Sequence, residues 1–517
     1  MANNFISDVL KTYSINTFKN TFAVPNDLNI GLVFIGKSDE YESEPTIDVP
    51  YNVDSYRKKI WDGMVAALEI HPGDVELVIP KRDWQSSVEY KQYDDTVLVS
   101  ELNAVDDANS IEPMFVYTTS GNVYKCLSNN NSVVSTVEPT GDYVTSNGFI
   151  STADGYVWKY MYNVKPTNRF LTTDWIPVPY SIDTITSETD YTVDRDSLID
   201  GAITTIVVDD GGSGYYNTTH SNSYLSGTQT LSCGDLANVV VGMGVSGTGI
   251  PAGSYVISRN EFTSTLTINA PTTANGTEYI TSTRVVISGD GIGAAATATL
   301  TDDSIEKITV TSFGSNYVYA NVNIYGTSTN AVVRPVFPIK HGHGYSPALE
   351  LYAKDMMIVR DINNEEAYAN NFIPEDIEFR QYGILMNPHT YGSDQTITYT
   401  TANTVLIQTT NVTVSGGLPY TQYEYLYQGT TYATSTFSGF LVSEDVANNI
   451  VKLTNVRGTP SIGGLLKGNT SSVSRPISTY LNPDMEKYSG DIVYVNNTDS
   501  IARAPGQTEE LRFIIKL

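Results

Sequence analysis

The chain has 517 residues, with 30 basic and 57 acidic side chains and a formal net charge of −27. That length exceeds one ordinary hydrophobic core, so we expect about two to four domains. An acidic chain without a basic patch repels a phosphate backbone, which excludes nucleic acid as a partner. Charged residues make up only 17%, and the abundance of serine, threonine, asparagine, glycine and tyrosine favours strands and turns over helices.

The cysteine count and the hydropathy pattern exclude further classes of protein. Two distant cysteines, Cys126 and Cys233, can form neither a disulfide framework nor a zinc-binding spacing. The first residues lack a basic region followed by an apolar run, so we expect no secretory signal. No apolar run approaches about 18 residues, so no membrane span is expected either.

The N-terminal part predicts two helices and one strand. Residues 5–22 have apolar side chains at imperfect helical spacing, namely Phe5, Val9, Ile15, Phe18 and Phe22. "NIGLVFIG" (29–36) is typical of a buried strand. Residues 52–70 have the clearest helical pattern, with Asn52 or Asp54 as its cap and "HPG" (71–73) as its end. One stripe of this predicted helix consists of Tyr56, Ile60, Met64, Ala67 and Leu68.

From residue 74 onward the pattern changes to short strands separated by turns. Residues 114–127 predict a hairpin that turns at Ser120, Gly121 and Asn122. In "DGYVWKYMY" (154–162), aromatic residues alternate with other side chains, which predicts a strand with one packed aromatic face.

A glycine-rich region, 191–330, follows and is interpreted as an all-β module. Within it, "ITTIVVDDGGSGY" (203–215) resembles "IEKITVTSFGSNY" (305–317), a weak internal repeat of two units. Ordinary globular composition returns at 334–357, and "FRQYGILMNP" (379–388) predicts a buried strand. A second threonine- and glycine-rich β segment occupies about 391–475, and the chain closes with two strands, "YSGDIVYVNN" and "TEELRFIIKL".

Two segments imitate nucleotide-binding loops. "GLVFIGKS" (31–38) matches the phosphate-loop pattern, but its middle residues are strand formers and an acidic segment without a helical stripe follows. "VVISGDGIGAAATA" (285–298) has the glycines of a dinucleotide fingerprint, but an alternating strand pattern stands where a helix should begin. We therefore interpret the first as a strand and the second as a tight β-turn.

Other residues could form a metal or catalytic site only with help from elsewhere. "HGHG" (341–344) offers two histidines that need further ligands to hold a metal, and a glycine-rich turn is favoured. Glu138, Asp142 and Asp154 could supply an acid and a base for glycoside cleavage, with Trp158 stacking on a sugar. Paired carboxylates are common by chance in so acidic a chain, and no nucleophile elbow is present. We predict no catalytic, cofactor-binding or metal-binding residues.

Several segments in order resemble the baseplate wedge subunit of T-even-type contractile-tailed phages, the gene-product-eight family. They cover about 1–180, 332–390 and 480–517. After the helix that contains Trp61, the segments are "VIPKRDW" (78–84), "VYKCL" (123–127), "EPTG" (138–141), "DGYVWKYMY" (154–162), "EFRQYGILMNP" (378–388), "YSGDIVYVN" and "QTEELRFIIKL". The resemblance assigns a structural role to Trp61, Arg82, Asp83, Trp84, Glu138, Pro139, Asp154, Gly155, Tyr156, Trp158, Arg380, Asn387, Pro388 and Gly490.

The resemblance implies a mainly β, multi-domain protein with an α+β, β-sandwich-like core, a few helices and two inserted all-β modules. The predicted parts are a core in three pieces, 1–190, 331–390 and 476–517, with insertions at 191–330 and 391–475. It also implies a structural homodimer without enzymatic activity or cofactor, assembled in the host cytoplasm into the virion. Its partners would be other wedge proteins and peripheral fibre-bearing proteins.

A second interpretation stays open. The tyrosine- and tryptophan-rich composition and the β insertions are also compatible with a glycan-binding or glycan-cleaving tail protein. The two interpretations differ in whether the protein releases reducing ends from envelope polysaccharide.

Overall fold

The computed structural model describes residues 7–23, 30–40, 53–106, 108, 110–142, 148–185, 190–195, 198–363, 372–393, 405–417 and 419–517. Two compact units make up the chain. Unit 1 contains Met1–Thr12 and Val78–Ala353, and unit 2 contains Tyr13–Leu77 and Lys354–Leu517. Each unit therefore joins segments that are far apart in the sequence. Of the predicted features, Phe5 and the helix cap Asn52 lie outside the described residues.

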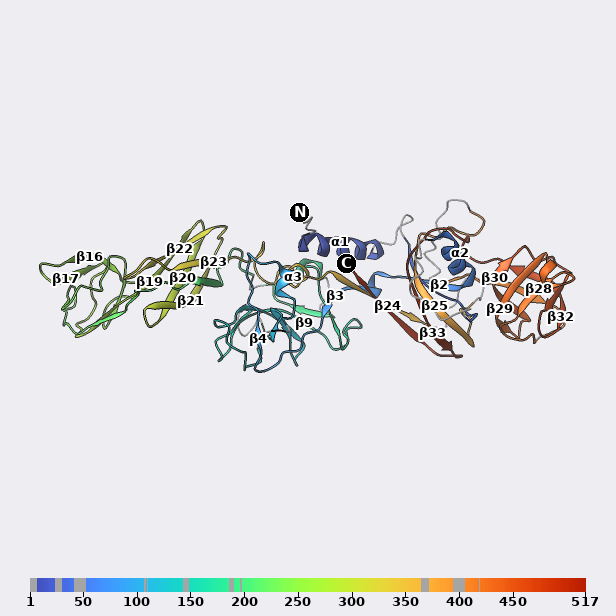
Figure 1. Ribbon diagram of the computed structural model, residues 1–517, viewed down its shortest axis with the longest axis horizontal. Helices are drawn as coiled ribbons and strands as arrows, with labels where there is room; N and C mark the ends of the chain where they lie inside the picture. The colour runs from blue at the N-terminus through green and yellow to red at the C-terminus, as the bar shows by residue number, and fades with distance from the viewer. Residues whose placement is uncertain are drawn as a thin grey trace. The chain divides into compact units, whose positions relative to one another are not determined.

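Strands make up 45% of the structure and helices 9%, which confirms the prediction of a mainly β, multi-domain protein (Figure 1). None of the described helices has the length and hydropathy needed to cross a bilayer. The described helices are α1 (Asp8–Ala23), α2 (Asp54–Gly63), α3 (Val99–Leu102) and α5 (Pro347–Glu350), with 3-10 turns η1 (Pro72–Asp74), η2 (Ile182–Thr184) and η4 (Tyr432–Thr434).

The helix predicted at 5–22 is confirmed by α1, but the helix predicted at 52–70 is wrong over its second half. Helix α2 ends at Gly63, and strand β2 (Met64–Glu69) follows at once. All six residues of β2 are buried, because it pairs with β1 (Gly31–Gly36) on one side and β26 (Val405–Ile407) on the other. A strand inside a sheet that is covered on both faces reads as a continuous apolar run, which also fits helical spacing.

The sheet around β2 is the centre of unit 2. Its order is β26-β2-β1-β25-β33, where β25 is Ile377–Met386 and β33 is Asp491–Arg503. Every neighbouring pair in this sheet is antiparallel. In the same unit, β24 (Asp355–Ile362) pairs with the C-terminal strand β34 (Glu509–Lys516). The buried strands predicted at 29–36 and 379–388 and the two C-terminal strands are thus confirmed.

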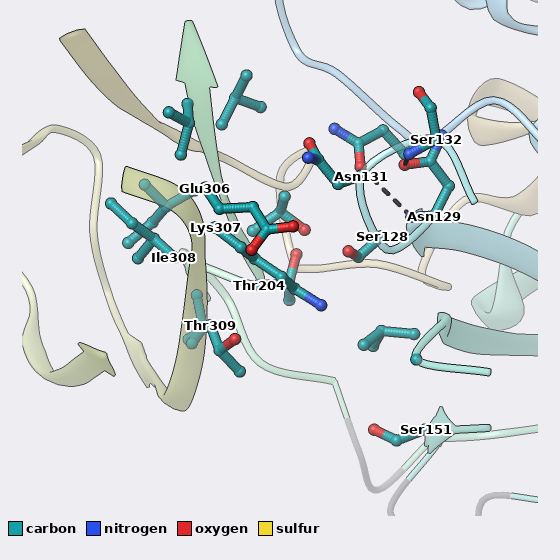
Figure 2. Close-up of a pocket in the computed structure, with 18 of the residues that line it drawn as sticks. Ser128, Asn129, Asn131, Ser132, Ser151, Thr204, Glu306, Lys307, Ile308 and Thr309 are labelled. Atoms are coloured by element: carbon teal, nitrogen blue, oxygen red, sulfur yellow. Dashed lines mark hydrogen bonds between the residues drawn. The ribbon is translucent and has the colours of Figure 1, made fainter. Parts of the chain in front are cut away.

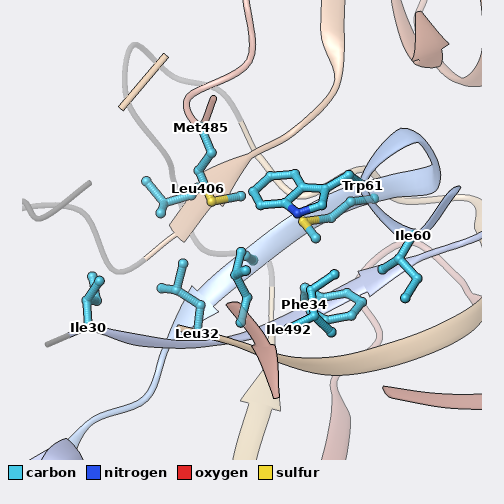
Figure 3. Packing of buried hydrophobic residues seen from close by; sticks show 11 residues of the cluster. Ile30, Leu32, Phe34, Ile60, Trp61, Leu406, Met485 and Ile492 are labelled. Carbon is cyan, nitrogen blue, oxygen red and sulfur yellow. The ribbon is translucent and has the colours of Figure 1, made fainter. Parts of the chain in front are cut away.

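Helix α2 covers one face of this sheet. Its Trp61 is 1% exposed and packs into a cluster with Leu32 and Phe34 of β1. Figure 3 shows Trp61, Leu406 and Met485 converging on the strand that carries Leu32 and Phe34. The period of two places these β1 side chains on one face, while Val33 and Ile35 are buried on the other.

A closed six-stranded barrel forms the rest of unit 2 (Figure 1). Closure leaves no exposed strand edge, so a small β module can stand on its own core. The core of the barrel includes Val412, Leu426, Leu441, Leu453 and Leu466. The strands, in barrel order, are β27 (Thr410–Val414), β30 (Ile450–Arg457), β29 (Phe437–Asp445), β28 (Tyr425–Gln428), β31 (Leu465–Gly468) and β32 (Ser474–Leu481).

Unit 1 begins with a sheet of order β11-β9-β7-β6, to which β8 is added by pairing with β9. The hairpin predicted at 114–127 is confirmed by β6 (Phe115–Tyr117) and β7 (Asn122–Ser128), and the predicted aromatic strand by β9 (Val157–Val164). The remaining strands here are β8 (Phe149–Ser151), β11 (Tyr191–Val193), β10 (Trp175–Pro177), which pairs with β3 (Val75–Pro80), and the parallel pair β4 (Glu89–Tyr90) and β5 (Ile111–Glu112).

Residues from about 203 to 336 form further small sheets in unit 1. Strand β12 (Thr205–Asp210) pairs with β23 (Val332–Val336), beside a sheet of order β21-β20-β19-β22. This sheet consists of β19 (Arg284–Gly289), β20 (Ile292–Thr301), β21 (Ser304–Ser315) and β22 (Ala320–Tyr325). Two three-stranded sheets share a separate core, and they contain β13 (Thr218–His220), β14 (Thr230–Ser232), β15 (Gly244–Gly247), β16 (Val256–Asn260), β17 (Thr265–Ile268) and β18 (Tyr279–Ser282).

The predicted domain boundaries stay a prediction. Strand β11 begins at Tyr191, where the first insertion was predicted to start, and it pairs with β9. Most of the barrel lies within the second predicted insertion, 391–475, but β32 continues to Leu481. These strands show which residues pair, and excision experiments would show which segments fold independently.

The segment that forms the two three-stranded sheets is the best defined for an excision experiment. The chain enters and leaves them at adjacent points, because the Thr283 N–H donates to Asn217 Oδ1 at 2.9 Å. Their core of Leu231, Met243, Val256 and Leu266 is their own. We therefore expect a protein in which two glycines replace residues 218–282 to remain folded. Soluble, cooperatively unfolding protein in thermal circular dichroism and size exclusion is the expected result, and insoluble product would contradict it.

Candidate functional site

Two lysines face each other in the interior of unit 1. Lys125 on β7 and Lys159 on β9 are directly opposite in the antiparallel register, and both are buried. Like charges at such a cross-strand position destabilise a sheet unless each is neutralised. The structure supplies one carboxylate for each lysine, from segments that are distant in sequence.

Lys125 is paired with Glu350 of α5. Its Nζ donates to Glu350 Oε2 at 2.7 Å and lies 3.1 Å from His343 Nδ1, and all three side chains are buried. The same ammonium lies 3.7 Å from the centre of the Tyr93 ring, a cation–π contact. Glu350 Oε1 accepts from the Gly344 N–H at 2.7 Å, so both carboxylate oxygens have partners.

Lys159 is paired with Asp194, which follows β11. Its Nζ donates to Asp194 Oδ2 at 3.1 Å, and the side chains are 0% and 2% exposed. The ammonium also lies 4.7 Å from the centre of the Phe149 ring on β8. We call Lys125, Lys159, Asp194, His343 and Glu350 the buried charge cluster. It connects three strands of one sheet to the 341–350 segment.

The "HGHG" turn shapes this cluster. Gly342 and Gly344 have φ of 91° and 96°, values that favour glycine, and a turn forms there as predicted. A Cβ on Gly344 would lie 3.2 Å from Lys159 Cε, so a larger residue would crowd the lysine. The sequence did not indicate the buried role of His343. Among the described residues, no group of three histidine, cysteine or acidic side chains could hold a metal.

The charges of the cluster balance when His343 is neutral. Burial, followed by the neighbouring Lys125 ammonium, lowers the pKa of His343 to about 4. Burial alone would raise the pKa of Glu350, but Lys125 and His343 outweigh it and the pKa falls to about 2. Burial also lowers the pKa of both lysines, against the pull of their carboxylates. Two ammoniums and two carboxylates leave no net charge in the interior.

The first group of motif residues gathers around Ser135 in unit 1. Trp84 Nε1 donates to Ser135 Oγ at 3.2 Å, and Ser135 Oγ donates to Asp154 Oδ2 at 3.1 Å. Tyr156 and Trp158 are buried with ring centres 5.4 Å apart, so Trp158 is a core residue and is not exposed for sugar stacking. The other motif residues of this unit are Arg82, Asp83, Glu138, Pro139 and Gly155.

These residues shape turns and loop contacts. The Arg82 carbonyl accepts from the Tyr117 N–H at 2.6 Å. Asp83 is exposed and forms an ion pair with Lys81, while Pro139 is buried. Gly155 has φ of 85°, and a Cβ there would lie 2.6 Å from Asn130 Cγ.

Glu138 and Asp154, two of the three carboxylates considered for glycoside cleavage, accept hydrogen bonds from neighbouring loops. Asp154 Oδ2 accepts from the Thr136 and Val137 N–H groups at 2.8 and 3.0 Å. Burial alone would raise the pKa of Asp154, but hydrogen bonds from Thr152 and these amides outweigh it and lower the pKa. Glu138 Oε1 accepts from the Thr119 N–H at 3.0 Å. These contacts hold loops against the aromatic strand.

The second group of motif residues lies in unit 2. Trp61 belongs to the core described above, and Arg380 donates to the Ser38 carbonyl at 2.9 Å. Asn387 has φ of 51° and pairs with Ile30 twice, through its own N–H at 2.9 Å and through Oδ1 at 2.8 Å. Gly490 has φ of 61°, and a Cβ there would lie 2.4 Å from the Met386 carbonyl and 2.8 Å from Pro388 N.

The first nucleotide-loop imitation is a strand and the second contains a short turn between two strands, as interpreted. Residues 31–36 form the buried strand β1, and Lys37 Nζ donates to Asp39 Oδ2 at 2.8 Å. Residues 284–301 form β19 and β20 with a short turn between them. Neither segment begins a helix that could receive a phosphate.

Comparisons with known proteins give one distant similarity. No family model matches the chain. A 208-residue stretch is 24% identical to "Baseplate wedge protein gp8" of Enterobacteria phage T4. This chain is similar to a phage baseplate protein. The match covers 33% of this chain, less than the motifs suggested, and the chain spans 60% of the length of that curated relative. At most, the similarity suggests a baseplate-related phage protein.

The buried charge cluster predicts strong coupling between Lys125 and Glu350. Lys125→Met and Glu350→Gln should each lower the free energy of unfolding by about 3–5 kcal/mol, because each leaves a buried charge without its partner. The double variant should lose less than the sum. Urea denaturation measures all three. The control is Lys81→Met, which removes a partly exposed ion pair and should cost less than about 1 kcal/mol.

The pKa of His343 predicts loss of stability in acid. The unfolded state binds a proton near pH 6.5 and the folded state only near pH 4, so stability falls as the pH drops through this window. The loss should reach on the order of 3 kcal/mol near pH 4. His343→Asn, which keeps an acceptor for Lys125, should flatten the pH dependence in urea titrations. Parallel curves for the two proteins would contradict the assignment. Glu350 adds a similar loss below pH 4.5 in both proteins.

Proposed function

We propose that the chain is a structural subunit of a phage tail baseplate wedge. The similarity to a baseplate wedge protein carries the proposal. The placement of the motif residues supports it, because those residues pack cores, close turns and hold loops. Side chains such as Trp61 and Trp158 are buried, and Asn387 and Gly490 have backbone conformations that few residues adopt.

In this proposal the protein is a homodimer in each wedge and links the inner baseplate to peripheral fibre-bearing proteins. It is made in the host cytoplasm and incorporated into the virion. The family resemblance supports the dimer and these partners. Because the net charge is −27, partner surfaces should be basic where they meet exposed acidic side chains.

The proposal includes no enzymatic activity and no cofactor. Two of the three carboxylates considered for catalysis, Glu138 and Asp154, accept hydrogen bonds from backbone groups of neighbouring loops. A general acid needs a raised pKa, whereas that of Asp154 is lowered. Incubation with host-envelope polysaccharide should therefore release no reducing ends.

Assembly can be tested with the purified chain. We expect light scattering to give a dimer at micromolar concentration that survives dilution, salt and a chelator. Joining other wedge proteins of the same phage should slow as salt rises, because salt screens exposed charges more than apolar contacts. In electron micrographs of tails, an antibody against the chain should bind at the baseplate end. A monomer, or tails that do not contain the chain, would overturn the proposal.

A further inference from the structure

A cleft of about 430 Å³ lies inside unit 1, between the end of strand β7 and strand β21. This volume is in the range of roughly 300–1,000 Å³ typical of small-ligand sites. One wall is the loop Ser128–Ser132, and the other includes Lys307, Ile308 and Thr309. Figure 2 shows Asn131 and Ser132 on one side of the cleft and Ile308 and Thr309 on the other.

The polar lining of the cleft is neutral. Its charged residues are Glu306 and Lys307, whose charges are opposite. Lys307 Nζ also donates to Asn130 Oδ1 at 2.6 Å. Hydroxyl and amide groups make up the rest of the polar lining. The side chains of Ser128, Asn131, Ser151 and Thr309 form no hydrogen bond with any other residue that the structure describes, so they can bond a ligand.

An apolar strip lies beside these polar groups. It includes Val157, Ile308, Val310 and Phe313. The Phe313 ring is supported by Phe149, with ring centres 4.6 Å apart. A ligand that suits both parts has hydroxyl groups at its edges and an apolar face, and it has no net charge. A sugar ring has these properties, whereas a phosphate or a nucleotide needs a net positive lining, and here Glu306 offsets the one cation, Lys307.

The walls of the cleft are held in place before any ligand arrives. Thr205 Oγ1 donates to the Leu127 carbonyl at 2.7 Å, which joins β12 to the end of β7. Asn130 Nδ2 donates to the Asp154 carbonyl at 2.9 Å. A preformed site loses less conformational entropy on binding.

Three consecutive residues on one wall have left-handed backbone conformations. Asn130, Asn131 and Ser132 have φ of 53°, 65° and 62°. Such a run costs free energy, and strain of this kind concentrates at binding sites. The conformation holds Asn131 and Ser132 at the cleft, where both line its wall.

We propose that this cleft binds a neutral oligosaccharide without cleaving it. The proposal is independent of the baseplate function, since it rests only on the geometry of unit 1. Hydroxyl and amide groups would bond the edges of the sugar, and Phe313 with its aliphatic neighbours would contact its apolar face. No bond is made or broken, so no acid or base is required.

Saturation-transfer NMR on the full chain tests the proposal, with maltohexaose, cellohexaose and chitohexaose as separate probes. We expect transfer to at least one probe. Asn131→Gly removes the amide and keeps the left-handed backbone, and it should weaken binding up to about tenfold. Thr309→Trp fills the cleft and should abolish the signal. The matched controls are Asn316→Gly, at φ of 63° outside the cleft, and Ser246→Trp on an exposed strand position.

Each outcome either supports or overturns the proposed saccharide site. Transfer that survives both controls and is lost with Thr309→Trp supports a saccharide site at this cleft. No transfer from any of the three probes overturns the proposal, as does a signal that Thr309→Trp leaves unchanged. An uncharged peptide rich in serine and asparagine serves as a competitor. Binding of this peptide without binding of any saccharide would assign the cleft to a protein partner and overturn the proposal. Thermal melting confirms that each variant is folded.

Discussion

Two lysine side chains that face each other across neighbouring strands set the main constraint on unit 1. Lys125 and Lys159 are buried, so each requires a carboxylate within hydrogen-bonding distance. Asp194 lies 35 positions from Lys159 in the sequence, and Glu350 lies 225 positions from Lys125, and these two carboxylates meet the requirement. The interior is electrically neutral only when the 341–350 segment places Glu350 beside Lys125. Nonpolar packing alone tolerates small shifts of a segment, whereas a buried ion pair does not.

Backbone conformation has a similar role at the motif positions. Gly155, Asn387 and Gly490 have positive φ, where most side chains are strained. At Gly490 a Cβ would also meet the Met386 carbonyl, and the Asn387 side chain replaces a strand partner for Ile30. The resemblance to a baseplate subunit thus rests on residues that determine how strands end and meet. Such residues stabilise the fold, and they say little about which surface contacts a partner.

The two units stabilise their small β modules in different ways. In unit 2, the strands β27 to β32 close into a barrel and have no free edge. In unit 1, the sheets formed by residues 203–336 are joined to the preceding part of the unit by specific polar bonds, including Arg334 to Asp94 and Thr205 to the Leu127 carbonyl. The proposed saccharide cleft lies between the end of β7 and β21. A cleft of this kind arises from the way one β module is attached to another.

Local sequence patterns were sufficient to predict the buried strands at 29–36 and 379–388, the hairpin at 114–127, the aromatic strand β9 and the mainly β class. The periodicity of side chains and the residues of turns are local properties. Local patterns failed at 64–69, where a run buried on both faces satisfied helical spacing equally well and the partners β1 and β26 decided for a strand. A lysine amid apolar residues, as in "VYKCL" and "VWKYM", did not by itself indicate a buried partner. The sequence by itself determined the two strands that carry these lysines. Only the tertiary structure decided that Glu350 and Asp194 neutralise them and that His343 stays neutral beside them, because such pairing depends on distances between segments that local spacing does not contain.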